Sequence, residues 1–385
     1  MVPEQGLVSP ADPARILIGV TADVSVGLLS GLPQRLAADG WEVHVASSPG
    51  ERLETLGAEQ GVTVHSLPMA REIDIVRDVR GLREWIRLIR RLRPDVVFAG
   101  TPKAGLLGIT AARLLGVRTR VYHLRGLRLE TAAGTTRRVL TIMERLTIRL
   151  ATTTLAVSPS LRKRVLSLGL ASDPRVTVLG HGSSNGVDVD RFRPGNAGAR
   201  VEGLIPDVPV IGFVGRLNHD KGLDVLAAAC RVLDDERVEY QLLIVGGIDG
   251  AELGAFSSLR RAPVVLGAVA DTSMYYPLMR ALCLPTLREG FPNVVLEAGA
   301  TGIAVVTTDA TGAVDSVIPE RTGLMVPAGD ARQLAGALQR VIEDPRLAEG
   351  LGAAARDFVV ENFRRDLVHA SVSDFLRREM VRGRR

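Results

Sequence analysis

Short runs of β-branched and apolar residues alternate with longer segments of helical periodicity along this chain of 385 residues. The pattern predicts an α/β fold, because parallel strands are joined by crossover helices that cover both faces of the sheet. Ser158 is placed to cap one of the helices. In the first half we expect strands over 15–20, 42–47, 62–67, 95–99, 118–123 and 153–156, and helices over 28–39, 77–92, 104–115 and 135–150.

The alternation occurs twice, and a passage rich in Gly, Asn and Pro from 180 to 209 separates the two halves. The length also favours two domains, since one core seldom serves so many residues. We place the domains at 1–195 and 196–365, with a C-terminal helix at 366–385 that packs toward the first domain. In the second half we expect strands over 210–214, 240–245, 263–266, 281–285 and 304–307, helices over 222–233, 293–301 and 331–343, and a largely helical end over 351–384.

Composition excludes several classes of protein. With 46% hydrophobic and 24% charged residues, the chain has no uninterrupted apolar stretch that could span a bilayer. Residues 1–14 contain Glu4, Asp12 and three prolines, which is unlike a secretory signal, so we expect a cytoplasmic protein. Cys230 and Cys283 are each embedded in an apolar stretch and are predicted to be buried free thiols.

The net charge of +5 is unevenly spread, because arginines recur between Arg77 and Arg149 against few acids. This predicts a cationic face on the first half, unless the arginines reflect compositional bias alone. Only 4% of residues are aromatic and no nucleic-acid reading motif is present, so we expect no nucleic-acid partner. A phosphate-bearing substrate, or the inner face of a membrane bound peripherally, fits the face better.

A first candidate site follows the predicted strand 210–214, at Gly215-Arg216-Leu217-Asn218-His219-Asp220-Lys221-Gly222. Gly215 permits a tight turn, and Arg216 and Lys221 can both reach a phosphate near the start of the next helix. Taken alone, the stretch could also be a turn with two solvated cations.

A second candidate site lies at Glu289-Gly290-Phe291-Pro292-Asn293-Val294-Val295-Leu296-Glu297. A loop with Gly290 enters a helix at Asn293, so the amides of Phe291, Asn293 and Val294 are donors at a positive helix end. Glu289 in the loop and Glu297 one turn inside the helix can accept hydrogen bonds from different hydroxyl groups of one elongated ligand. Taken alone, they could be a surface residue and a helix ion-pair partner.

Together these stretches resemble glycosyltransferase family 4, a group of retaining enzymes of the GT-B fold. A third motif, Asn185-Gly186-Val187-Asp188 with Phe192, stands at the family's spacing, and the resemblance covers nearly the whole chain. It implies two Rossmann-like doubly wound parallel-sheet domains facing a central cleft, with ligands beyond the carboxyl ends of the strands.

The resemblance also implies roles for the donor residues. Arg216 and Lys221 would bind the diphosphate of a nucleotide sugar, Glu289 the sugar hydroxyls and Glu297 the ribose. The backbone near Gly267 would lie by the base. The remaining residues expected around the donor are Gly27, Gly215, Gly290, Phe291, Asn293 and Val294.

The first half resembles the subgroup that extends lipid-linked oligosaccharides for capsule or exopolysaccharide. The resemblance rests on Thr101-Pro102-Lys103-Ala104-Gly105-Leu106-Leu107-Gly108 and on Leu124-Arg125-Gly126-Leu127-Arg128-Leu129-Glu130-Thr131. Such acceptors carry pyrophosphate on a polyprenol, and Lys103 at a helix start is a suitable contact for one phosphate. His123 and Arg128 complete the expected acceptor residues. Lys103 could instead only cap the cleft.

Two positions depart from the family's pattern. Relatives commonly have a histidine before the glycine that corresponds to Gly126, whereas this chain has Arg125 there and His123 two residues earlier. Either Arg125, which we favour as a catalytic contact to the sugar or phosphate, or His123 fills this role. The glycine-rich N-terminal loop of the family is reduced to Gly27.

Asp188-Val189-Asp190 could be interpreted as the metal-binding Asp-x-Asp of another glycosyltransferase fold. The pair lies inside the third motif, and the diphosphate is already expected to meet cationic side chains, so we predict no metal and no cofactor beyond the donor itself.

The sequence therefore predicts a retaining, metal-independent transferase that uses a nucleotide sugar, with a UDP-sugar favoured. Its predicted acceptor is the hydroxyl of a polyprenyl-pyrophosphate-linked saccharide. Three alternatives remain: a nucleotide-sugar epimerase on the same architecture, a non-catalytic sugar-nucleotide sensor, and an oxidoreductase. The last lacks a Gly-x-Gly-x-x-Gly turn after the first strand.

Overall fold

The computed structural model describes residues 13–69, 74–250 and 252–384. Residues 1–12, which make up most of the N-terminal stretch unlike a secretory signal, lie outside the described residues. The chain forms two compact units, one of residues 1–123, 143–154 and 372–385, the other of 124–142 and 155–371. The domain bounds expected from the sequence stay a prediction.

The first sheet contains seven strands of the described chain in the order β3-β2-β1-β4-β5-β6-β7. The pairs from β3 to β5 are parallel, with Ile16 opposite both Val43 and Val96. Strand order reverses between β1 and β4, so the crevice that binds ligands in such sheets lies beyond these two strands. The bounds are Arg15–Gly19 (β1), Glu42–Ser47 (β2), Val62–Ser66 (β3), Val96–Gly100 (β4), Thr119–Leu124 (β5), Thr153–Ala156 (β6) and Val176–Thr177 (β7).

The second sheet contains six strands of the described chain, all parallel, in the order β10-β9-β8-β11-β12-β13. Its reversal falls between β8 and β11, so the segments that follow these two strands line the equivalent crevice. The bounds are Val210–Val214 (β8), Gln241–Val245 (β9), Val264–Val265 (β10), Ala281–Leu284 (β11), Ala304–Thr308 (β12) and Leu324–Val326 (β13).

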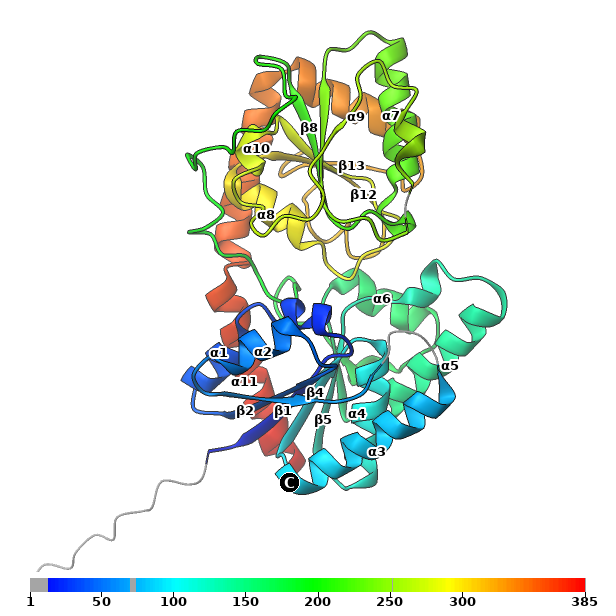
Figure 1. The fold of residues 1–385 in the computed structure, drawn as a ribbon, viewed down its shortest axis with the longest axis vertical. Helices are drawn as coiled ribbons and strands as arrows, with labels where there is room; N and C mark the ends of the chain where they lie inside the picture. Colours follow the sequence, from blue (N-terminus) through cyan, green and yellow to red (C-terminus); the bar gives the residue numbers. More distant parts are fainter. Residues whose placement is uncertain (1–12, 70–73, 251, 385) are drawn as a thin grey trace, which may run out of the picture. The chain divides into compact units, whose positions relative to one another are not determined.

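Helices cover both faces of the second sheet, where α7 packs against α9 and α8 against α10, on opposite sides (Figure 1). The helices of the first half are Leu32–Ala38 (α1), Glu51–Gly57 (α2), Ile75–Leu92 (α3), Pro102–Leu114 (α4), Gly134–Leu150 (α5) and Pro159–Ser167 (α6). Those of the second half are Leu223–Asp235 (α7), Asn293–Thr301 (α8), Ala331–Glu343 (α9), Pro345–Asn362 (α10) and Arg365–Arg384 (α11).

The core of the first unit is built around Trp85 of α3, which is fully buried. A Cβ at Gly19 would lie 2.5 Å from its ring, and one at Gly108 3.3 Å from it. The indole therefore needs glycine on β1 and leaves little room at Gly108 on α4. Arg377 of α11 lies over the ring of Trp41, 5.3 Å from its centroid, and the end of α11 belongs to this first unit.

The α/β class and the doubly wound parallel sheets predicted from the sequence are confirmed, and several elements match to the residue, such as 210–214 and 331–343. Ser158 caps α6 by accepting a hydrogen bond from the Leu161 amide. The single helix expected over 28–39 is wrong. Ser30 and Gly31 have φ of 42° and 84°, so a 3-10 helix (η1, Asp23–Leu29) ends there and α1 starts anew.

None of the described helices is long and apolar enough to cross a membrane. Cys230 and Cys283 are buried free thiols, as predicted. Burial raises the pKa of Cys230 to about 12 and also raises that of Cys283 well above its ordinary value, which keeps both in the unreactive thiol form.

Candidate active site

The segment after β8 is fixed by glycines that no other residue could replace. A Cβ at Gly222, whose φ is 70°, would lie 1.9 Å from the carbonyl oxygen of Pro285. A Cβ at Gly246 would come equally close to the carbonyl oxygen of Gly215. The turn that holds Lys221, the 3-10 helix His219–Lys221, is thus pressed against the end of β11. This places Lys221 at the reversal point of the second sheet.

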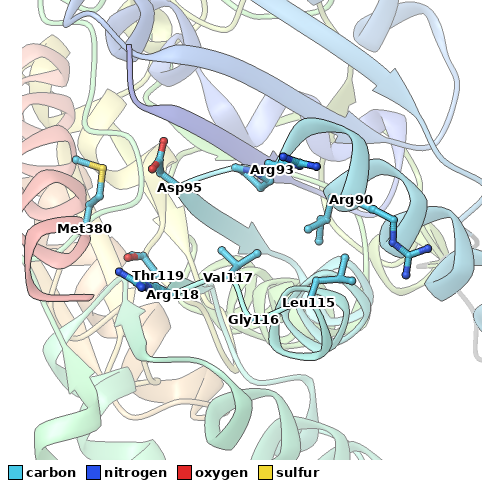
Figure 2. A pocket seen from close by; sticks show the side chains of 11 residues that line it. Arg90, Arg93, Asp95, Leu115, Gly116, Val117, Arg118, Thr119 and Met380 are labelled. Carbon is cyan, nitrogen blue, oxygen red and sulfur yellow. The ribbon is translucent and has the colours of Figure 1, made fainter. Parts of the chain in front are cut away.

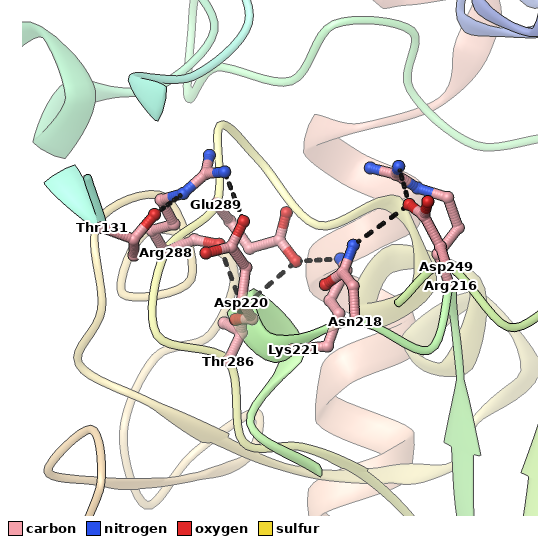
Figure 3. Close-up of polar contacts among 9 residues, drawn as sticks. All are labelled: Thr131, Arg216, Asn218, Asp220, Lys221, Asp249, Thr286, Arg288 and Glu289. Carbon is pink, nitrogen blue, oxygen red and sulfur yellow. Dashed lines mark hydrogen bonds and ion pairs between the residues drawn. The ribbon is translucent and has the colours of Figure 1, made fainter. Parts of the chain in front are cut away.

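Two adjacent ion pairs join the first two sequence motifs, as Figure 3 shows. Lys221 pairs with Glu289, and the preceding residue Asp220 pairs with Arg288. The four side chains are 14–27% exposed, so these pairs are screened by water much less than surface pairs. Thr286 and the Leu287 amide both donate to the Asp220 carbonyl, at 2.9 and 2.8 Å. The structure therefore brings Lys221 and Glu289 together.

Arg216 lies at the same edge but is held by a different acid. Its Nη1 is 2.6 Å from the Asp249 carboxylate, and the Asn218 amide reaches that carboxylate at 3.5 Å (Figure 3). The Arg216 side chain is 58% exposed, so the guanidinium faces solvent and could exchange Asp249 for an anionic ligand. Gly267, expected near the base, has φ of 67° and accepts a hydrogen bond from Gly246 at 2.7 Å.

Glu297 lies on α8 and makes its contacts apart from Lys221 and Glu289. Its carboxylate accepts hydrogen bonds from Tyr276 at 2.7 Å and Thr272 at 3.4 Å. Burial raises the pKa of Glu297, and these two donors partly offset the rise. Phe192 of the third motif packs edge-on against Tyr276, with ring centroids 5.8 Å apart, and so supports the residue that orients Glu297.

Phe291, Asn293 and Val294, whose amides are expected to contact the donor, lie around the start of α8. Pro292 occupies the N-cap and supplies no side-chain cap, so the first amides of the helix keep no partner within it. The side-chain oxygen of Asn293 is buried without a hydrogen-bond partner. Phe291 is buried against Phe363, at 5.3 Å between ring centroids, which anchors the loop.

Arg125 follows β5, and its backbone lies against Gly290. A Cβ at Gly290 would be 1.9 Å from the Arg125 carbonyl oxygen, so glycine is required there. Burial lowers the pKa of Arg125 to about 10, which still leaves it charged at neutral pH. His123, the alternative to Arg125, is buried and stacked on Phe98 at 4.8 Å.

The predicted acceptor residues lie on different elements. Lys103, in the first turn of α4, is buried and pairs with Asp78 of α3 at 2.7 Å. Beside it Thr21 and Thr101, beyond the ends of β1 and β4, share a hydrogen bond of 2.7 Å. Arg128 is exposed at the start of a short 3-10 helix. Gly27, which is expected near the donor, lies in η1, where a Cβ would be 3.0 Å from the Arg52 guanidinium.

The carboxylate of Asp188 is engaged within the third motif. Asp188 accepts hydrogen bonds from the amides of Asp190 and Arg191 at 3.2 and 3.0 Å, and it pairs with Arg365 at 3.3 Å. It therefore shapes a turn.

Four charged residues around the expected site were not predicted from the sequence. Asp78 and Asp249 pair with the expected residues Lys103 and Arg216, whereas Asp220 and Arg288 pair with each other next to Lys221 and Glu289. Asp220 and Arg288 had a detectable signal, since each directly precedes a predicted site residue with the opposite charge. A pocket of about 510 Å³, lined by Arg90, Arg93 and Arg118 among others, lies at the other end of β4 and β5 and shares no residue with the candidate site (Figure 2).

Comparison with known proteins decides the family. Residues 208–344 match the family described as "Glycosyl transferases group 1", and residues 29–182 match "Glycosyl transferase 4-like domain". The chain is 34% identical over 356 residues to the capsular polysaccharide biosynthesis glycosyltransferase CapM of Staphylococcus aureus, covering 91% of this chain and 93% of CapM. The chain belongs to glycosyltransferase family 4. The resemblance drawn from the sequence motifs is thereby confirmed.

The names of two further relatives of this glycosyltransferase state different donors. A "GDP-mannose-dependent alpha-mannosyltransferase" of Mycobacterium tuberculosis is 35% identical over 73% of each chain. A "UDP-Gal:alpha-D-GlcNAc-diphosphoundecaprenol alpha-1,3-galactosyltransferase" of Escherichia coli is 25% identical over 77% of this chain and 78% of its own. The family therefore establishes nucleotide-sugar glycosyl transfer for this chain and leaves the base open.

Solved structures confirm the GT-B fold. A sucrose-phosphate synthase of Thermosynechococcus elongatus superposes with a TM-score of 0.82 at 21% identity, covering 96% of this chain and all of that one. HepE of Anabaena, solved with UDP-glucose, superposes with a TM-score of 0.73 at 18% identity, covering 94% of this chain and 99% of that one.

Proposed function

We propose that this glycosyltransferase moves a hexosyl unit, with retention, from a UDP-sugar to a hydroxyl of a polyprenyl-pyrophosphate-linked saccharide in surface polysaccharide synthesis. The observation that carries the proposal is the paired contact of Lys221 with Glu289 and of Asp220 with Arg288, at the reversal point of the second sheet. This contact supports the proposal because it brings a cation, the proposed partner of the diphosphate, next to a carboxylate, the proposed partner of the sugar hydroxyls.

In the proposed reaction Lys221 and Arg216 stabilise the departing diphosphate. Negative charge builds up on its oxygens as the glycosidic bond breaks, so cations that are already in place lower the barrier most. Glu289 accepts hydrogen bonds from the sugar hydroxyls, and Glu297 from the ribose. Arg125 contacts the sugar or the phosphate.

Retention follows, in this proposal, from attack of the acceptor hydroxyl on the same face that the diphosphate leaves. The leaving phosphate takes the proton of the attacking hydroxyl, the new glycosidic bond forms, and nucleoside diphosphate is released. No metal is required in this scheme, because the cationic side chains supply the charge that a metal would supply. Full loss of activity in EDTA would contradict that part.

The UDP-sugar and the lipid-linked acceptor are supported by the similarity to the Escherichia coli galactosyltransferase, whose name gives UDP-Gal as donor and a diphosphoundecaprenol-linked sugar as acceptor. The capsule context is supported by the similarity to CapM over most of both chains. Lys103 is the proposed contact of the acceptor pyrophosphate, for which it exchanges its partner Asp78. Lys103→Ala should then raise the acceptor KM while the donor KM stays constant.

The test is product analysis after incubation with labelled UDP- and GDP-sugars, with and without a polyprenyl-pyrophosphate sugar. We expect an elongated lipid-linked product, with the anomeric configuration of the donor, from a UDP-sugar. An epimerised free nucleotide sugar, or tight binding with no turnover of any donor, would overturn the proposal. Transfer from GDP-sugars alone would overturn the donor assignment.

A further inference from the structure

One face of helix α5, Gly134–Leu150, whose course is drawn in Figure 1, combines exposed apolar side chains with arginines. Val139, Ile142 and Leu146 are 37%, 65% and 44% exposed, and their spacing of three and four residues places them on one stripe. The side chains that share this exposed face are Thr135, Arg138, Val139, Ile142, Arg145, Leu146 and Arg149.

The same face carries no acid. The helix has a single acidic residue, Glu144, which is buried and accepts a hydrogen bond from Tyr122 of β5 at 2.7 Å. Thr147 and Ile148 are buried beside it. The inner face thus holds α5 on the first sheet, while the outer face presents only cations, one hydroxyl and large apolar groups.

An exposed helix normally carries acids and cations on its outer face, because such pairs stabilise the helix and keep the surface soluble. An outer face of arginines and large aliphatic residues is instead typical of helices that lie in a membrane interface. Their apolar groups enter the acyl boundary while the guanidinium groups contact lipid phosphates.

We propose that α5 is a docking surface for an anionic phospholipid bilayer, with Val139, Ile142 and Leu146 inserted and Arg138 and Arg145 on the headgroups. Charge complementarity favours this occupant over a zwitterionic bilayer. The aliphatic stripe favours it over nucleic acid, which would be met by aromatic or polar side chains. The docking surface rests on the proposed function in one respect, since a lipid-linked acceptor is reached at the bilayer.

Vesicle sedimentation with the whole protein tests the charge part of the docking surface. The wild type should sediment with vesicles that contain phosphatidylglycerol and far less with pure phosphatidylcholine. The double variant Arg138→Gln with Arg145→Gln should bind the anionic vesicles about 30-fold more weakly, from the contribution of each arginine near such a surface. Arg332→Gln with Arg346→Gln removes two exposed arginines elsewhere and should bind like the wild type.

A fluorescent label tests the insertion part. Ile142→Cys can be labelled selectively, because the native Cys230 and Cys283 are buried and their raised pKa values keep them protonated. The label should shift to shorter emission wavelengths on adding anionic vesicles. Leu114 is 66% exposed on α4, nearly the same as Ile142, and a label at Leu114→Cys should not shift.

Equal binding to both kinds of vesicle, unchanged binding of the Arg138 and Arg145 variant, or equal shifts from both labels would overturn the docking surface. Binding of an oligonucleotide at α5 without vesicle binding would do the same. Transfer from a nucleotide sugar to a detergent-dissolved acceptor, without vesicles, is measured in parallel on every variant. Since this activity should be unchanged, failure of the docking surface and failure of the proposed function give different results.

Discussion

Lys221 and Glu289 lie 68 residues apart in the chain and form an ion pair in which both side chains are mostly buried. The residues before them, Asp220 and Arg288, form a second pair of the opposite polarity. The two loops that follow β8 and β11 are therefore held in one register by charge as well as by the close packing of Gly222 on Pro285. This relation gives the candidate site a defined geometry before any donor binds.

Lys221, the cation of the Lys221–Glu289 pair, should contribute strongly to the rate of transfer. Lys221→Ala is expected to lower kcat/KM for the donor by about 100-fold, the usual result of removing one preorganised contact to developing charge. Initial rates at varied donor concentration measure it. Lys163→Ala removes an exposed lysine outside the site and serves as the control. A Lys221→Ala variant with wild-type kcat/KM would contradict the assigned role.

Arg288 and Asp220 should act through Lys221 and Glu289. Arg288→Gln leaves the Asp220 carboxylate beside Lys221, where it competes with Glu289, so kcat/KM should fall about tenfold. Asp220→Asn added to Arg288→Gln should restore part of the loss, as a double-mutant cycle would show. The exposed pair of Arg340 with Glu320 offers a matched control, Arg340→Gln, which should leave kcat/KM unchanged. Additive losses at Asp220 and Arg288 would mean that the two act independently.

Glu297 should contribute to the affinity of the protein for the donor nucleotide. Glu297→Gln replaces an anionic acceptor by a neutral one, and we expect the dissociation constant for the nucleoside diphosphate to rise roughly tenfold. Tyr276→Phe removes the hydroxyl that orients Glu297 and should give a smaller rise. Calorimetric titration measures both. A Glu297→Gln variant that binds the nucleotide as tightly as the wild type rules out the ribose contact.

Glu144 should make stability depend on pH. Burial raises its pKa to about 7, against 4.5 in the unfolded chain, so the folded state binds more protons between these values. The contribution of this group to stability is complete below pH 4.5 and is lost as pH rises to about 7. Glu144→Gln keeps an acceptor for Tyr122 and cannot ionise. The free energy of unfolding of Glu144→Gln, measured relative to that of the wild type, should therefore rise by about 2 to 3 kcal/mol between pH 5 and pH 8.

Denaturant titrations at the two pH values provide this comparison. Parallel pH dependences of the wild type and Glu144→Gln would contradict the buried, protonated state of Glu144.

Much of the fold could be predicted because its signals are local. Val210–Val214 is a continuous apolar run that follows Pro209, which is typical of a strand buried on both faces. Ala331–Glu343 is a long, strongly periodic helix that Asp330 caps. The short strand Leu324–Val326 and the seven-residue helix Glu51–Gly57 were missed, since so few residues define no clear period. The helix predicted over 28–39 failed because Ser30 adopts positive φ, which its residue type does not signal.

The expected site residues could be read from motifs, but their partners could not. Asp249 binds Arg216 across 33 positions, and Asp78 neutralises Lys103 across two helices. These contacts depend on strand order, which places the ends of β8 and β11 side by side. The partners of Glu297 could not be predicted either. The spacing of the motif predicts that Glu297 and Glu289 contact one ligand, but it does not indicate the hydrogen bonds that Glu297 accepts from Tyr276 and Thr272.

The most direct measurement is a thermal-shift panel of UDP- and GDP-sugars on the wild type and on Lys221→Ala. A donor that binds the folded protein raises the melting temperature by mass action. We expect a clear rise in the melting temperature with at least one UDP-sugar, and loss of most of that rise in Lys221→Ala. A shift of equal size in both proteins, or no shift with any nucleotide sugar, would contradict a donor site at Lys221 and Glu289.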